Sequence, residues 1–245
     1  TLDFAKSEQL NPRITFTRSS TGTYLDIDGL IKTAPSGVAR FEYDSSGNAL
    51  GLLVEESRTN LSTHSDFSAG WSVIRATLSA VTGVAPDGVS TPTLLESTTT
   101  STASTSQTIT TGATAALSVY AKAGTTDQLV ILLNGAVAWF DLSAGTVGTV
   151  TNGSASILNL ANGWHRCSLV SSSAVHQVKR FYVGGSTDGQ YSNAIGENLL
   201  IWGAQIEEGS FHTSYIPTSG STVTRAADLA TMPTAGIYGD EFTTI

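Results

Sequence analysis

Short runs of alternating apolar and polar residues, separated by turn residues, occupy most of this chain. From residue 59 to about residue 217, Gly, Ser and Asn punctuate these runs at regular spacing, which is typical of antiparallel strands rather than βαβ units. Apolar residues keep the i, i+3, i+4, i+7 spacing for three turns in no segment, so we expect little helix. The predicted strands are 71–76, 91–96, 104–110, 116–123, 128–134, 137–142, 147–151, 154–160, 164–171, 178–184 and 197–207. The pattern predicts an all-β fold, an antiparallel β-sandwich of the jelly-roll type.

The first 58 residues show a different pattern, with two hairpins in a short stretch. Asp28 and Gly29 form a turn signal between the apolar runs 24–27 and 30–31. A second turn, 44–48, lies between 40–43 and 51–55. Two hairpins are too short to hold a full core alone, so we expect an arm that docks elsewhere.

This pattern divides the chain into three parts. We predict a β-hairpin arm over 1–58, the jelly-roll sandwich over 59–217, and an extended segment over 218–245 that leads into a further domain. The stretch 97–114 consists mostly of Ser, Thr, Ala and Gly. Because Thr is a good strand former, we predict a solvated edge strand around Gln107, Thr108 and Ile109; a disordered linker is the alternative.

Composition and charge remove several classes of protein. The chain is 40% hydrophobic and only 13% charged, which is not the profile of a disordered protein. A net charge of −8 repels phosphate backbones, so we expect no nucleic-acid partner. With no run of 18 apolar residues and no signal-peptide pattern at residue 1, we expect no membrane insertion. The single cysteine, Cys167, is expected to be a buried small hydrophobe.

Motifs that carry catalytic chemistry are absent from the sequence. It contains no G-x-S-x-G elbow, H-E-x-x-H pair or glycine-rich phosphate loop. The adjacent pairs Glu55-Glu56 and Glu207-Glu208 lie in predicted strands, where neighbours point to opposite faces, so neither pair can flank one glycosidic bond. We therefore expect a protein without catalytic activity.

Aromatic residues in the strands suggest a binding role instead. Sugar rings stack on aromatic side chains while amides and charged groups bind their hydroxyls, although a Trp in a sandwich core is the alternative for each aromatic residue. We predict that Trp202 shares a core face with Leu200, Ala204 and Ile206, and that Trp139 and Phe140 point opposite ways. The predicted carbohydrate-binding residues are Tyr120, Lys122, Trp139, Tyr191, Gln205 and Glu207.

No cofactor is predicted with certainty, but the loops contain oxygen ligands that suit a structural calcium ion. These are Asp66, Asp87, Asp127, Asp188 and Asn193. None of them has the spacing of an EF-hand loop.

Several strings resemble a module that recurs in tail-fibre and other tail-associated proteins of bacteriophages and prophages. They are 11–24 (NPRITFTRSSTGTY), 40–44 (RFEYD), 51–61 (GLLVEESRTNL), 202–209 (WGAQIEEG), 213–218 (TSYIPT) and 224–228 (TRAAD). Between them, 66–71, 85–88, 118–124 and 163–164 are similar to landmarks of carbohydrate-binding-module jelly rolls.

The resemblance implies a β-sandwich with a concave sheet face, located on a virion tail or extracellular, often as a homotrimer of sister chains. It transfers no catalytic residue. The leading hypothesis is a non-catalytic carbohydrate-binding module of a phage receptor-binding protein, which recognises a host-surface or environmental polysaccharide. A structural oligomerisation module of the virion and a polysaccharide-degrading enzyme are the alternatives.

Overall fold

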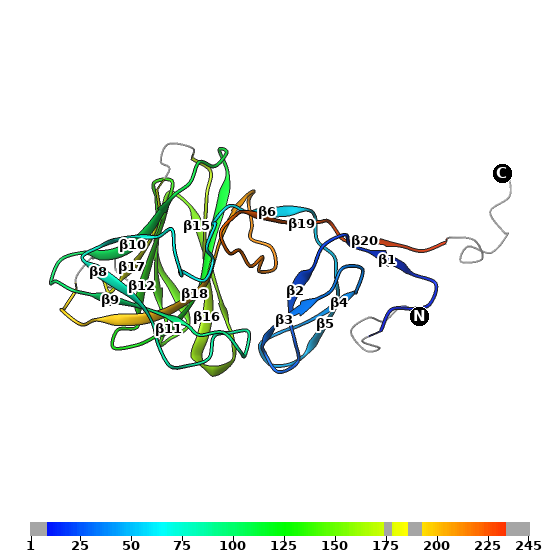
Figure 1. Cartoon of the computed structure of the whole chain (residues 1–245), viewed down its shortest axis with the longest axis horizontal. Helices are drawn as coiled ribbons and strands as arrows, with labels where there is room; N and C mark the ends of the chain where they lie inside the picture. Colours follow the sequence, from blue (N-terminus) through cyan, green and yellow to red (C-terminus); the bar gives the residue numbers. More distant parts are fainter. Residues whose placement is uncertain (1–8, 174–177, 186–192, 234–245) are drawn as a thin grey trace.

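The computed structural model describes residues 9–173, 178–185 and 193–233, and these form an all-β structure (Figure 1). The described residues contain one 3₁₀ turn, Ala161–Gly163, and no α-helix. No helix in the described part of the chain is long and apolar enough to cross a membrane.

Twelve strands form an antiparallel β-sandwich, as the alternating pattern predicts. The chain crosses between the two sheets several times, at β7–β8, β9–β10, β10–β11, β11–β12, β14–β15, β16–β17 and β17–β18. Sheet I has the order β14 (Thr146–Thr151), β13 (Ala136–Asp141), β12 (Gln128–Leu133), β17 (Val178–Val183), β10 (Ala103–Thr108), β7 (Ser72–Ile74). Sheet II has the order β15 (Ser154–Asn159), β16 (Trp164–Ser171), β11 (Ala115–Ala123), β18 (Asn198–Glu208), β9 (Thr93–Ser97), β8 (Ala76–Ala80).

The main core lies between the two sheets and follows strand alternation. Leu117, Val119 and Ala121 of β11 point into it, and Ile131 and Phe140 face them from sheet I, all fully buried. Cys167 is also fully buried in this core, and burial raises the pKa of its thiol. Packing of these apolar side chains, at roughly 1.5–3 kcal/mol for each one fully buried, is the main stabilising term of the sandwich.

Two hairpins, β2 (Gly22–Leu25) with β3 (Ile31–Ala34) and β4 (Arg40–Tyr43) with β5 (Ala49–Leu53), form the predicted arm. The arm lies beside the sandwich in Figure 1. Leu25 and Ile31 pack against Tyr120, Trp164 and Trp202 on the outer face of sheet II, in a second buried cluster. The arm thus borrows part of its core from the sandwich.

After β18 ends at Glu208, residues 209–233 run back along sheet II and the arm, and we call them the return segment. Two short strands follow where the sequence shows little periodicity: β19 (Val223–Arg225) pairs with β6 (Arg58–Asn60), and β20 (Leu229–Thr231) pairs with β1 (Thr15–Thr17). The β1–β20 ribbon extends from the side of the arm that faces away from the sandwich (Figure 1).

Two local predictions were wrong. Trp202 does not share the core face with Ala204 and Ile206, because a bulge at Gly203, whose φ is 65°, adds one residue to β18 and reverses the alternation. Ala204 and Ile206 point into the main core, whereas Trp202 faces the arm.

The second error concerns β10. This strand lies between β17 and β7, and its residues 103–107 are buried, so it is not a solvated edge strand. Thr and Ser hydroxyls can satisfy their hydrogen bonds inside a sheet, and the polar composition therefore misled the prediction.

A buried ion cluster, formed by Arg18, Arg40, Glu55, Arg225 and Asp228, joins the arm to the end of the chain. Asp228 accepts from Arg18 at 3.0 Å and from Arg40 at 2.5 Å, and its side chain is completely buried. Glu55 pairs with Arg40 at 2.9 Å and with Arg225 at 3.5 Å. Four of the strings that carry the phage resemblance supply these five residues.

Candidate functional site

A hollow lies where the arm meets sheet II, and we call it the junction hollow. It has two lobes, of about 300 Å³ and 530 Å³, which share Asp66, Ser90 and Trp202 as lining residues. The first lobe is also lined by Thr23, Ile31, Thr33, Ser65, Asp87, Tyr215, Pro217, Thr218 and Ser219. The second continues along β8 and the loop before β9, past Leu78, Ser79, Ala80, Val89, Thr91 and Thr93.

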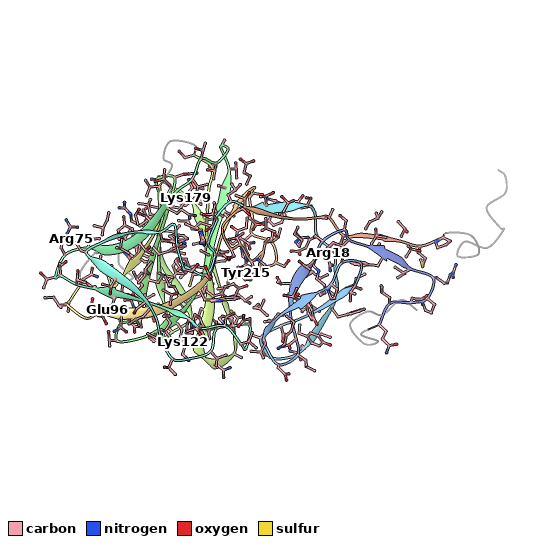
Figure 2. All side chains as sticks on the ribbon, in the orientation of Figure 1. Arg18, Arg75, Glu96, Lys122, Lys179 and Tyr215 are labelled. Atoms are coloured by element: carbon pink, nitrogen blue, oxygen red, sulfur yellow. The ribbon has the colours of Figure 1, made fainter. Side chains whose placement is uncertain are left out.

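Two aromatic rings line the first lobe. Trp202 and Tyr215 have ring centroids 4.6 Å apart, with an interplanar angle of 52°. Figure 2 shows Tyr215 on the side of the sandwich that faces the arm. Both side chains are at most 5% exposed, so they present a limited edge or face to the hollow.

Hydrogen bonds hold Tyr215 in place. Its hydroxyl lies 2.6 Å from the Ser65 hydroxyl, and its backbone carbonyl accepts a hydrogen bond from Thr23 of the arm at 2.5 Å. Burial raises the pKa of Tyr215, and the carboxylates of Asp66 and Asp87 act in the same direction. The ring is therefore rigid, neutral at ordinary pH and close to both acidic groups.

The two carboxylates of the hollow come from the loops that precede β7 (Asp66) and β9 (Asp87). Asp87 accepts from the backbone N–H groups of Val89 and Ser90, at 3.0 and 2.8 Å, and from the Ser90 hydroxyl. The side chain of Asp66 accepts hydrogen bonds from the N–H and the hydroxyl of Ser68, at 3.1 and 2.7 Å, both through Oδ1. Neither carboxylate forms an ion pair with the described residues.

The loop 84–92 is tied to the arm, which fixes the shape of the hollow. Ile31 of β3 donates its backbone N–H to the Pro86 carbonyl at 2.9 Å. The Trp164 indole donates to the Val84 carbonyl at 3.2 Å from β16. The loop that carries Asp87 and Ser90 is thus anchored to β3 and β16, which preorganises this wall of the first lobe.

Three of the residues predicted to bind carbohydrate are buried beneath the arm and the return segment. Tyr120 is 2% exposed, packs on Trp202 with ring centroids 5.4 Å apart, and lies under the Arg166 guanidinium. Gln205 and Glu207 have no exposed surface. A glycan cannot reach these three side chains in this structure.

Gln205 and Glu207 instead hold the return segment against sheet II. The Gln205 amide oxygen accepts from the Ile216 backbone N–H at 2.6 Å. The Glu207 carboxylate accepts from the Thr213 N–H at 2.9 Å and from its hydroxyl at 2.6 Å. These bonds place Tyr215, which lies between the two anchored residues, in the hollow.

The other three predicted residues lie apart from the hollow or outside the described residues. Lys122 is half-buried on the outer face of sheet II, paired in register with Trp164 and Leu200. Tyr191 lies outside the described residues. Trp139 points away from Phe140, as predicted, and is 5% exposed in a small cluster with Val130 and Tyr182 on the outer face of sheet I.

The predicted calcium ligands are not brought together as a set. Asp66 and Asp87 share the hollow, Asp127 accepts from Gln128, and Asn193 donates to the Val183 carbonyl. Asp188 lies outside the described residues. Among the residues that the structure describes, no three His, Cys, Asp or Glu side chains form a group that could hold a metal ion.

Sequence reasoning named Asp66 and Asp87 only as calcium ligands and missed Tyr215 as a site residue. The strand pattern carries no signal for this hollow, because loops far apart in the sequence form it. The one available signal was the string 213–218, which carries part of the phage resemblance.

Two solved structures of known proteins are similar to this chain in their fold. No family model matches the chain, and no curated protein matches it. The enzymatically active domain of tailspike protein 4 from bacteriophage CBA120 is similar with a TM-score of 0.36 and 15% identity. That likeness covers 60% of this chain, which spans about a fifth (21%) of the tailspike domain's length.

A second solved structure is the CBM22-1 xylan-binding domain of Paenibacillus barcinonensis Xyn10C. Its TM-score is 0.37 and its identity 10%, with 63% of this chain and 94% of that domain covered. Likenesses at this level carry no argument about the function of this chain.

Proposed function

We propose that this chain is a non-catalytic carbohydrate-binding β-sandwich of a phage tail protein, with the junction hollow as its binding site. The observation that carries this proposal is the lining of the hollow: two aromatic rings, several hydroxyls and two carboxylates without ionic partners. Aromatic rings stack on the C–H faces of sugars, and carboxylates and hydroxyls bind sugar hydroxyl groups. The sequence resemblance supports the assignment to a virion tail and to a host-surface or environmental polysaccharide.

The affinity of a single shallow site of this kind is modest. We expect a Kd of roughly 10 μM to 1 mM for one oligosaccharide. Sister chains in a trimer would raise the apparent affinity for a repeating polysaccharide through multivalency.

Filling the hollow tests the proposal directly. Thr33 lines the first lobe and is exposed, so Thr33→Arg places a long side chain in the hollow without disturbing the core. The matched control is Thr146→Arg, at an exposed strand position of β14 in the other sheet. Binding to immobilised xylan, cello-oligosaccharides, chitosan and lipopolysaccharide O-chains is measured for all three proteins.

We expect the wild-type chain and Thr146→Arg to bind at least one glycan of the panel. Thr33→Arg should bind that glycan with at least tenfold lower affinity. If the wild-type chain retains none at millimolar concentration, or if both variants bind equally, the hollow is not a glycan site. Release of reducing ends during incubation with a bound polysaccharide would contradict the non-catalytic assignment.

A structural module of the virion is the second candidate, and the buried ion cluster favours it. Five residues from the strings that carry the resemblance to tail proteins form this cluster, which joins the arm to the segment after β18 and is an architectural feature. Light scattering on the purified chain separates the two. A stable trimer that binds no glycan of the panel supports the structural role.

A further inference from the structure

The charge of the junction hollow has one sign only. Asp66 and Asp87 line it, and none of its lining residues, all of them described, is Lys, Arg or His. The whole chain carries a net charge of −8, which adds to the local negative potential. Such a hollow repels uronic acids, sulfated sugars and phosphorylated sugars, and attracts a cation.

Asp66 is the carboxylate best placed to receive a charged donor. Asp66 is exposed, and its Oδ1 accepts both hydrogen bonds from Ser68. Its Oδ2 makes no hydrogen bond to the described residues, and no cationic side chain of the described chain pairs with it. A carboxylate in this state gains most from a donor that brings its own positive charge.

The aromatic pair beside Asp66 favours the same kind of group. Trp202 and Asp66 both line the two lobes, and the ring of Tyr215 packs against the ring of Trp202. The negative ring face of Trp or Tyr attracts an ammonium group, particularly where water is partly excluded. A sugar in the hollow that touches the exposed part of these two side chains can direct an equatorial substituent towards Asp66.

From these observations we propose that the junction hollow selects glycans with free amino groups, such as glucosamine residues in their ammonium form, over neutral and anionic glycans. This inference rests on the proposed function, because it names the sugar class for the same site. The ammonium group donates a charge-assisted hydrogen bond to Asp66, while the sugar ring contacts Trp202 and Tyr215. Asp87, whose oxygens already accept from its own loop, contributes charge rather than a free acceptor.

The test uses three β-1,4-linked oligosaccharides of equal length that differ only at carbon 2. Oligomers of glucosamine, N-acetylglucosamine and glucose present an ammonium, an acetamido and a hydroxyl group at that position. Titration calorimetry on the full chain at slightly acidic pH should give at least about tenfold tighter binding of the glucosamine oligomer, since a hydrogen bond to a charged group is the stronger one.

Two variants assign the preference to the site. Asp66→Asn keeps the oxygen that caps Ser68 but removes the charge, and should bring the glucosamine oligomer to the affinity of the glucose oligomer. Asp28→Asn is the control: Asp28 is exposed, lies in the β2–β3 turn outside the lining and loses the same charge. Melting temperatures of both variants verify that they fold.

The outcomes separate this inference from the proposed function. If glycans bind at the hollow but the three oligomers bind equally, or the glucose oligomer binds best, the amino-sugar inference is overturned and carbohydrate binding stands. If Asp28→Asn abolishes the preference as fully as Asp66→Asn, net charge and not the hollow causes it, which also overturns the inference. If no glycan binds the chain at all, the proposed function itself fails.

Discussion

At the scale of single residues, Glu42 shows how docking the arm alters the chemistry of a side chain. Burial raises the pKa of this β4 carboxyl from 4.5 to about 7, and the neighbouring Glu55 carboxylate acts in the same direction. The hydrogen bond from the Leu25 N–H and the charges of Arg40 and Arg166 oppose the shift. Around neutral pH this residue therefore sits between its two protonation states.

This shift predicts a pH dependence of stability. Between pH 4.5 and 7 the folded chain holds a proton on Glu42 that the unfolded chain has released, so the free energy of unfolding falls as pH rises through this range. Glu42→Gln cannot titrate and should be more stable than the wild-type chain at pH 8, by about 1–3 kcal/mol, with little difference at pH 4. Urea denaturation of both proteins at several pH values measures this. A constant difference across the pH range would contradict it.

At the scale of the element, strand β18 shows both the reach and the limit of sequence reasoning. In β11, strict alternation holds: Tyr120 lies on the face opposite to that of Leu117, Val119 and Ala121. In β18 the same reasoning failed at Gly203, because a bulge needs only one residue that tolerates positive φ, and glycine also occurs in regular strands and turns. An alternating pattern cannot reveal an inserted residue unless the partner strand is known.

The same limit applies to the candidate site. The sequence shows that Tyr120 and Gln205 lie on strands, but whether their face is open depends on what packs against it. The return segment covers this face through Thr213 and Ile216, and it has no periodicity that would predict its path. The junction hollow, formed by loop residues such as Asp66 and Asp87, depends entirely on that path.

The bulge leads to a prediction about Gly203. A Cβ there would lie 2.8 Å from Cδ2 of Tyr120 and 3.3 Å from Cε2 of Tyr215, at a backbone φ of 65°. Gly203→Ala should lower the free energy of unfolding by about 2–4 kcal/mol, from strain and crowding together. It should also weaken glycan binding, because both rings must shift.

Gly37→Ala is the matched control for backbone strain. Gly37 has a φ of 76°, but nothing lies within 4 Å of a Cβ built on it. This variant should lose only about 1 kcal/mol in denaturant titration. Equal losses in the two variants would mean that the rings near Gly203 do not constrain it.

At the scale of the whole molecule, the ion cluster joins parts that lie about 200 residues apart in the sequence. Three buried arginines face two carboxylates, Glu55 and Asp228, so every carboxylate in the cluster is shared. Leu25 and Ile31 of the arm are buried in a cluster with residues of sheet II, so the arm depends on these ion pairs and on its contact with that sheet. Hence the arm should be the part of the chain that opens first.

Asp228→Asn tests this view of the arm. The variant keeps an acceptor oxygen but leaves Arg18, Arg40 and Arg225 with one carboxylate, and breaking buried pairs in this way costs about 3–5 kcal/mol. Hydrogen exchange followed by mass spectrometry should show loss of protection in β2 to β5, while the sheets of the sandwich stay protected. The control is Glu56→Gln, which removes an ion pair between Arg58 and a 57% exposed carboxylate and should change stability by no more than about 0.5 kcal/mol. If Asp228→Asn instead lowers protection evenly across arm and sandwich, the two form one cooperative unit, and the junction hollow cannot open without unfolding the whole chain.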